Sequence, residues 1–144
     1  MYIFTPNTLI KSNEVNANFT ELKAKTDYLT TPDANWVVVA ANGNPQPSFM
    51  NGWVNYNGGY QTAAFYKDAL GIVHLKGLVT GGTFGAETAI FQLPVGYRPS
   101  LRLLIANQSN QTIGRVDVRA DGYVIANVGS GWFSLDNIHF KAEQ

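Results

Sequence analysis

From Pro32 to the C-terminus, short β-branched and aromatic runs alternate with turn signals, and no run keeps a helical period. The turn signals pair glycine with asparagine or aspartate, as in Asn57-Gly58-Gly59 and Asp121-Gly122. These residues favour tight turns because they tolerate left-handed backbone angles. Many short strands joined by such turns are typical of a β-sandwich or jelly roll. We therefore predict a mainly β chain in which residues 33–144 form a jelly-roll-like β-sandwich head.

The stretch "FYKDALGIVHLKGLV" predicts a hairpin whose turn lies around Asp68 to Gly71. In its second arm Val73 and Leu75 alternate with His74 and Lys76. Because side chains alternate between the faces of a strand, the two sets are expected on opposite faces.

Two further stretches predict structural roles. In "LPVGYRPS" the two prolines stiffen a corner, and we expect Tyr97 to pack its ring beneath it. In "VDVRADGYV" Asp117 and Arg119 alternate with valines, which is the pattern of a half-exposed strand.

One helical segment, "SNEVNANFTELKAKTDYL", precedes the β-rich part. Ser12 or Asn13 suits the N-cap, and Pro32 disfavours helical geometry at the residue before it. Apolar residues follow the a/d spacing of a coiled coil, with Thr26 in the one remaining slot. These apolar positions are Val15, Phe19, Leu22 and Leu29. We predict an extended anchoring arm over residues 1–11 and a coiled-coil-like helical neck over residues 12–30.

The seam covers only about two heptads, which is too short to associate stably without help. A short neck makes sense if the head itself oligomerises, and three-fold symmetry is the natural expectation for such a stalk. We therefore predict a homotrimer with the a/d residues facing its axis. The alternative is a lone amphipathic helix packed on its own domain.

Charge and composition exclude several classes of protein. Ten basic and ten acidic residues cancel, so the chain has no electrostatic footprint for nucleic acid. No apolar stretch is long enough to insert into a membrane, and the N-terminus lacks the pattern of a signal peptide. Cysteine is absent, which excludes disulfides and thiolate sites. We expect synthesis in a host cytoplasm.

The ionisable residues do not predict an enzyme. The two histidines, His74 and His139, fit no metal-binding pattern, so we expect neither a metal nor a cofactor. The carboxylates are dispersed along the sequence, and no nucleophile elbow or phosphate-binding loop is present. A glycosidase pair assembled between subunits stays conceivable, but no spacing indicates it.

Aromatic residues beside asparagine and glycine give the better functional signal, in "NGWVNYNGGY" and "GSGWF". Aromatic faces with neighbouring amides suit sugars, and rigid rings suit recognition surfaces in general. We predict a ligand-binding surface made of Trp53, Tyr56, Asn57 and Tyr60, and we note Trp132 as a further aromatic of this kind. The alternative is that these rings belong to the core or to a subunit interface.

The segments "LIKSNEVNANFTELK", "GIVHLKGLVTGG", "FQLPVGYRPS", "GRVDVRADGYV" and "WFSLDNIHFKAE" resemble bacteriophage tail fibres and receptor-binding proteins. The resemblance implies that the N-terminal part anchors to the virion, that the helix forms a trimeric neck and that the head contacts the host surface. In the arm, the apolar side chains expected to be buried by another virion protein are Tyr2, Ile3, Phe4 and Leu9.

Three functions remain open. The first is an adhesin of the virion, a short tail fibre or receptor-binding protein whose head touches the host envelope and its carbohydrate. The second is a head fibre, collar fibre or decoration protein with a purely structural role. The third, a glycan-processing enzyme, lacks candidates for an acid and a base.

Overall fold

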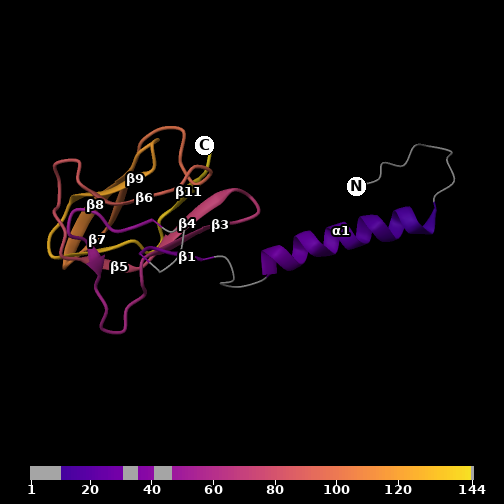
Figure 1. Ribbon diagram of the computed structural model, residues 1–144, viewed down its shortest axis with the longest axis horizontal. Coiled ribbons are helices and arrows are strands. Elements are labelled where there is room, and N and C mark those ends of the chain that lie inside the picture. Colours follow the sequence, from indigo (N-terminus) through magenta and orange to yellow (C-terminus); the bar gives the residue numbers. More distant parts are fainter. Residues whose placement is uncertain (1–10, 31–35, 41–46, 144) are drawn as a thin grey trace. The chain divides into compact units, whose positions relative to one another are not determined.

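The computed structural model describes residues 11–30, 36–40 and 47–143, with residues 28–30 described by their backbone only. The predicted anchoring residues Tyr2, Ile3, Phe4 and Leu9 and the side chain of Leu29 lie outside this description. The chain divides into two compact units, Met1–Ala34 and Asn35–Gln144, and we call the second unit the head. Figure 1 labels the helix and most strands.

The single described helix, α1, spans Ser12–Thr30. At its start the backbone N–H of Glu14 donates to Asn13 Oδ1 at 3.0 Å and to the carbonyl of Lys11 at 3.1 Å, so this donor of the first turn is satisfied. Two ion pairs lie on its polar surface, and each joins residues one helical turn apart. Lys23 pairs with Asp27 at 2.7 Å, and Lys25 pairs with Glu21 at 3.0 Å.

Eleven strands form two sheets among the described residues of the head. The four-stranded sheet has the order β1 (Val37–Val38), β3 (Ala64–Lys67), β4 (Ile72–Lys76) and β11 (His139–Lys141). The seven-stranded sheet has the order β2 (Val54–Asn55), β5 (Leu78–Thr80), β10 (Trp132–Ser134), β7 (Leu103–Ser109), β8 (Thr112–Val118), β9 (Tyr123–Val128) and β6 (Ala89–Gln92). The predicted mainly β class is confirmed.

The apolar faces of the two sheets share one core. Phe65 of the four-stranded sheet stacks on Phe91 of the seven-stranded sheet, with ring centroids 6.2 Å apart. Tyr97 of the proline-rich corner meets Phe65 edge-on at 5.2 Å, so its ring packs against this core. Both sheets therefore bury their inward-facing residues against each other, which is the packing of a sandwich.

The predicted hairpin is present as β3 and β4, with Val73 and Leu75 buried and His74 on the other face. On that outer face four rings cross the sheet in a row: Trp36, Tyr66, His74 and His139. Adjacent ring centroids lie 4.5, 4.7 and 6.2 Å apart. Asp68 Oδ2 lies 2.9 Å from His74 Nε2, so the turn residue also fixes the orientation of this imidazole.

Strands β7, β8 and β9 form a meander in the seven-stranded sheet, and Figure 1 shows them side by side. A register shift between Arg115 and Val116 in the β8–β9 pair marks a bulge. Of the side chains on β8, Val116 and Val118 enter the core, whereas Arg115 and Asp117 lie on the outer face. This outer face carries the pocket and the cluster of charged residues described below.

Candidate functional site

A pocket with a volume of about 390 Å³ opens on the outer face of the seven-stranded sheet. Leu78 of β5 and Ser134 of β10 are register partners on this face, and both line the pocket. Trp132 of β10 and Gln108 of β7 also line it. The pairing of β10 with β5 and β7 thus brings together residues that are far apart in the sequence.

The β2–β3 connection supplies the aromatic wall of the pocket. Tyr56 and Tyr60 line it, and their rings meet edge to face with centroids 5.3 Å apart. The backbone N–H of Tyr56 donates to the carbonyl of Leu78 at 2.8 Å, which ties the start of this loop to β5. Both rings stay substantially exposed, at 41% for Tyr56 and 60% for Tyr60.

The turn between these tyrosines is built from Asn57, Gly58 and Gly59, whose φ angles are 62°, 66° and 88°. Three consecutive left-handed residues reverse the chain tightly, because glycine and asparagine adopt such angles with little steric penalty. The reversal lets residues only four apart place their rings against each other.

A carboxylate completes the rim of the pocket. Asp136 lines it just after β10. Its Oδ1 accepts a hydrogen bond from the backbone N–H of Gly77 at 2.9 Å, and its Oδ2 accepts one from the Ser134 hydroxyl at 3.3 Å. The Asn107 amide donates to the carbonyl of Asp136 at 2.9 Å. Asp136 is thus held in one orientation by its neighbours.

The predicted ligand-binding residues do not all lie at this pocket. Tyr56 and Tyr60 line it, and Asn57 is exposed at the tip of the turn between them. Trp53 is only 1% exposed and packs edge-on against Phe84 in the core, so its ring is not available to a ligand. Trp53 is therefore a core residue, which was the alternative interpretation of its role.

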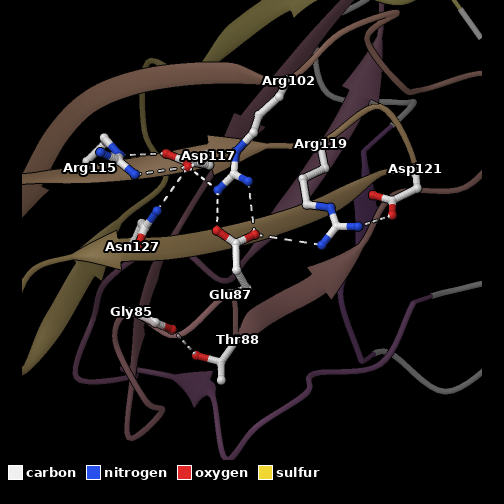
Figure 2. Close-up of polar contacts among 9 residues, drawn as sticks. All are labelled: Gly85, Glu87, Thr88, Arg102, Arg115, Asp117, Arg119, Asp121 and Asn127. Atoms are coloured by element: carbon white, nitrogen blue, oxygen red, sulfur yellow. Dashed lines mark hydrogen bonds and ion pairs between the residues drawn. The ribbon is translucent and has the colours of Figure 1, made fainter.

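A second cluster on the same sheet gathers charged residues around Asp117 (Figure 2). This carboxylate is fully buried, although the alternation predicted a half-exposed strand with Asp117 on its exposed face. Arg115 Nε donates to it at 2.8 Å, Arg102 Nε at 3.0 Å and Asn127 Nδ2 at 3.0 Å. These side chains cover Asp117, and the charge-assisted hydrogen bonds replace the water that it loses.

The cluster extends through Arg102 to Glu87. Arg102 Nη1 and Nη2 donate to the two carboxylate oxygens of Glu87 at 3.0 and 2.6 Å. Arg119 Nη2 donates to Asp121 at 2.6 Å, and its Nη1 lies 3.7 Å from Glu87 (Figure 2). Carboxylates that are dispersed in the sequence are therefore gathered and paired by arginines in the fold.

The pKa values of Asp117 and Glu87 are lowered, which does not suit a general acid. Burial raises the pKa of Asp117, but the hydrogen bonds from Arg115, Arg102 and Asn127 outweigh burial and bring it below its ordinary value. The hydrogen bonds from Arg102 likewise lower the pKa of Glu87. A glycosidase needs one carboxyl group with a raised pKa, and neither group meets that requirement.

Other kinds of site find no support among the described residues. No three histidine, cysteine, aspartate or glutamate side chains in residues 11–30, 36–40 and 47–143 are grouped to hold a metal ion. The helix in this part of the chain is not apolar enough to cross a membrane.

Comparison with known proteins gives one informative result. No protein-family model matches the chain, and no curated protein matches its sequence. The crystal structure of the receptor binding protein (gp15) of Listeria phage PSA is similar, with a TM-score of 0.60. The chain has the fold of a phage receptor-binding protein. The similarity covers 96% of this chain and 83% of that chain.

The sequence identity between the two proteins is 18%, so the likeness concerns the fold alone. It confirms, at the level of the fold, the resemblance to receptor-binding proteins that the sequence segments indicated. One of these stretches is "FQLPVGYRPS", which contains the end of β6, Phe91 and Gln92, and the corner after it.

Proposed function

We propose that this protein is a phage virion component whose head contacts the host surface through the pocket on the seven-stranded sheet. The observation that carries the proposal is the pocket itself, where Tyr56, Tyr60 and Trp132 line a hollow of about 390 Å³. The fold shared with a phage receptor binding protein supports the same role.

The chemistry of the pocket favours a carbohydrate ligand. Aromatic rings stack on the C–H faces of sugars, whereas amides and carboxylates bind their hydroxyls. Gln61 and Gln108 supply amides, and Asp136 supplies a carboxylate, beside the aromatic wall. A concave site that combines apolar walls with a few oriented polar groups is the usual form of a small-ligand site.

Trimerisation through α1 is part of this proposal. Phe19 and Leu22 are 67% and 54% exposed on the single chain, although their spacing is that of a coiled-coil seam. Thr26, which occupies an a/d slot, donates its hydroxyl to the carbonyl of Leu22 at 3.0 Å. The seam can therefore accept Thr26 without an unsatisfied hydroxyl. Three heads on one stalk would multiply weak sugar contacts through avidity.

We further propose that residues 1–11 attach the chain to another virion protein, with Tyr2, Ile3, Phe4 and Leu9 as the buried contacts. The test is a chain that begins at Lys11. We expect it to keep the melting temperature of the head while it fails to enter particles. Normal incorporation of the shortened chain would contradict this assignment.

A structural role as a head or collar fibre is the second candidate, and one observation favours it. Leu104, Ile113 and Val128 are 61%, 76% and 51% exposed on the outer face of β7, β8 and β9. Exposed aliphatic side chains that share one face suit a protein contact better than a sugar contact. The two candidates differ in whether the pocket binds anything.

The experiment that separates them replaces Tyr56 and Tyr60 together by alanine. The matched control replaces both by phenylalanine, which keeps the rings and removes the hydroxyls. Light scattering reports the size of each variant, and binding is measured on host cells. We expect the alanine pair to lose binding at unchanged size and the phenylalanine pair to retain most of it. If the wild-type protein binds no host surface, the structural role is favoured.

A further inference from the structure

The charge of the pocket restricts the ligand beyond its being a sugar. Among the described residues that line the pocket, Asp136 is the one charged side chain, and no lysine or arginine is present. The remaining polar side chains are tyrosine, glutamine and serine, which supply no positive charge. A ligand in this pocket therefore meets a negative charge.

Two basic residues, Lys76 just before β5 and Arg115 on β8 beside β7, are held by other partners. Lys76 lies two residues before Leu78, but its Nζ sits 4.1 Å from the centroid of the Trp36 ring on the other sheet. Arg115 lies on the same face of the seven-stranded sheet and donates to Asp117 at 2.8 and 3.2 Å. Each cation is engaged by a partner outside the pocket, so neither neutralises Asp136.

The carboxylate of Asp136 keeps the capacity to bind a ligand. A carboxylate oxygen has two acceptor sites, and the bonds from Gly77 and Ser134 occupy one site on each oxygen. One acceptor site per oxygen remains for a pair of donors. Because the backbone on both sides is fixed by Ser134 and Asn107, these acceptors are oriented before the ligand arrives.

We propose that the pocket selects an uncharged sugar and excludes glycans that carry a carboxylate or a phosphate at this position. Two adjacent hydroxyls of the sugar donate to the two oxygens of Asp136, in charge-assisted hydrogen bonds. The ring packs against the wall formed by Tyr56, Tyr60 and Trp132. An anionic group at the same place meets the like charge of Asp136 with no cation to offset it. This inference rests on the proposed binding of carbohydrate.

The test uses the chain of 144 residues on a printed array of neutral oligosaccharides and of matched oligosaccharides that carry uronate or phosphate groups. Affinities of the best neutral ligand and of its anionic counterpart are then measured by calorimetry. We expect the neutral ligand to bind at least about 10-fold more tightly, with little dependence on salt. A wild-type preference for the anionic ligand, lost in the Tyr56→Ala, Tyr60→Ala variant, would overturn the inference while upholding glycan binding.

Two variants test the role of charge. In Asp136→Asn the amide oxygen still accepts from Gly77, so we expect the fold to persist. Neutral affinity should fall by about 10-fold, because the hydrogen bonds lose their charge assistance, and the discrimination against the anionic ligand should shrink. Gln108→Lys places a cation on the rim. Because Gln108 makes none of the hydrogen bonds that hold Asp136, this variant should keep Asp136 in place and raise the affinity for the anionic ligand.

Unchanged affinities in both variants would overturn the role of Asp136. Failure of the proposed function has a different signature: no glycan on the array binds, or binding survives the double alanine replacement of Tyr56 and Tyr60.

Discussion

The ring of Tyr56 meets the ring of Tyr60 edge to face, with the two planes at 88° and the centroids 5.3 Å apart. The contact depends on the three left-handed residues between them, Asn57, Gly58 and Gly59. An added Cβ at Gly58 would meet nothing within 4 Å, so the space around the turn is open. At Gly58 the positive φ angle, and not a lack of space, restricts which residues the turn accepts.

The first prediction is therefore that Gly58→Val weakens the ring pair, whereas Gly58→Asn does not. A β-branched residue at a φ of 66° is strained by about 1–2 kcal/mol, and asparagine tolerates that region. We expect Gly58→Val to lower ligand affinity by about 10-fold and Gly58→Asn to stay close to the wild type. Equal affinities for the two variants would mean that the turn does not position the rings.

The second prediction concerns Asp117, which is fully buried and receives hydrogen bonds from Arg102, Arg115 and Asn127. In Asp117→Ala these donors lose their shared acceptor. We expect the free energy of unfolding to fall by about 3 kcal/mol, the low end for a broken buried pair, because the two arginines regain some hydration. Urea unfolding measures the change.

Arg119→Ala is the matched control for Asp117→Ala. The Arg119 side chain is 38% exposed and pairs with the side chains of Asp121 and Glu87, which are 42% and 49% exposed. Such pairs contribute less than about 1 kcal/mol. A similar loss of stability in both variants would show that burial of Asp117 does not set the strength of the cluster.

The third prediction concerns pH. For Asp68, burial raises the pKa, but hydrogen bonds from His74 and from the backbone of Ile72 and Leu70 outweigh it and lower the pKa. The pKa of Asp117 is also lowered. A lowered pKa in the folded state stabilises the protein above the ordinary value of 3.8, and that stability is lost as the pH falls through the folded-state pKa.

We therefore expect a nearly constant free energy of unfolding from neutral pH down to about pH 5, and a decline below about pH 4. Measurements of urea unfolding across this range give the slope. Asp68→Asn removes one of the carboxylates with a lowered pKa and should make the decline shallower. An identical slope in this variant would exclude Asp68 as a contributor.

Local sequence patterns predicted a hairpin and a tight turn correctly. The hairpin of β3 and β4 followed from alternation around Asp68 to Gly71, and its strands are joined by a turn of four residues. The turn at Asp121-Gly122 was equally visible, since Gly122 has a φ of 91° and donates its N–H back to the carbonyl of Arg119.

The pocket and the arginine cluster could not be predicted in this way, because non-local pairing creates them. Asp136 and Gln108 reach the aromatic wall only through the order β5–β10–β7 in the sheet. Asp117 of β8 is covered by Arg102, which lies fifteen residues earlier in the chain, directly before the neighbouring strand β7. Alternation alone gives the face of Asp117 and says nothing of what lies over that face.

The last prediction tests the neck. Lys23 and Lys25 flank the a/d seam, and each forms an ion pair within its own helix, with Asp27 and Glu21. Association of parallel helices therefore does not bring unpaired lysines together at the seam. Apart from Thr26, the described residues of the seam are apolar, chiefly Phe19 and Leu22.

Phe19→Asp with Leu22→Asp would place repelling charges in a desolvated seam, so we expect the proposed trimer to dissociate into monomers or to aggregate. Thr20→Asp with Ala24→Asp adds the same charge at exposed positions outside the a/d slots and should leave the trimer intact. Light scattering on both double variants gives the mass. A trimer that survives in the first variant would show that the head, rather than α1, holds the chains together.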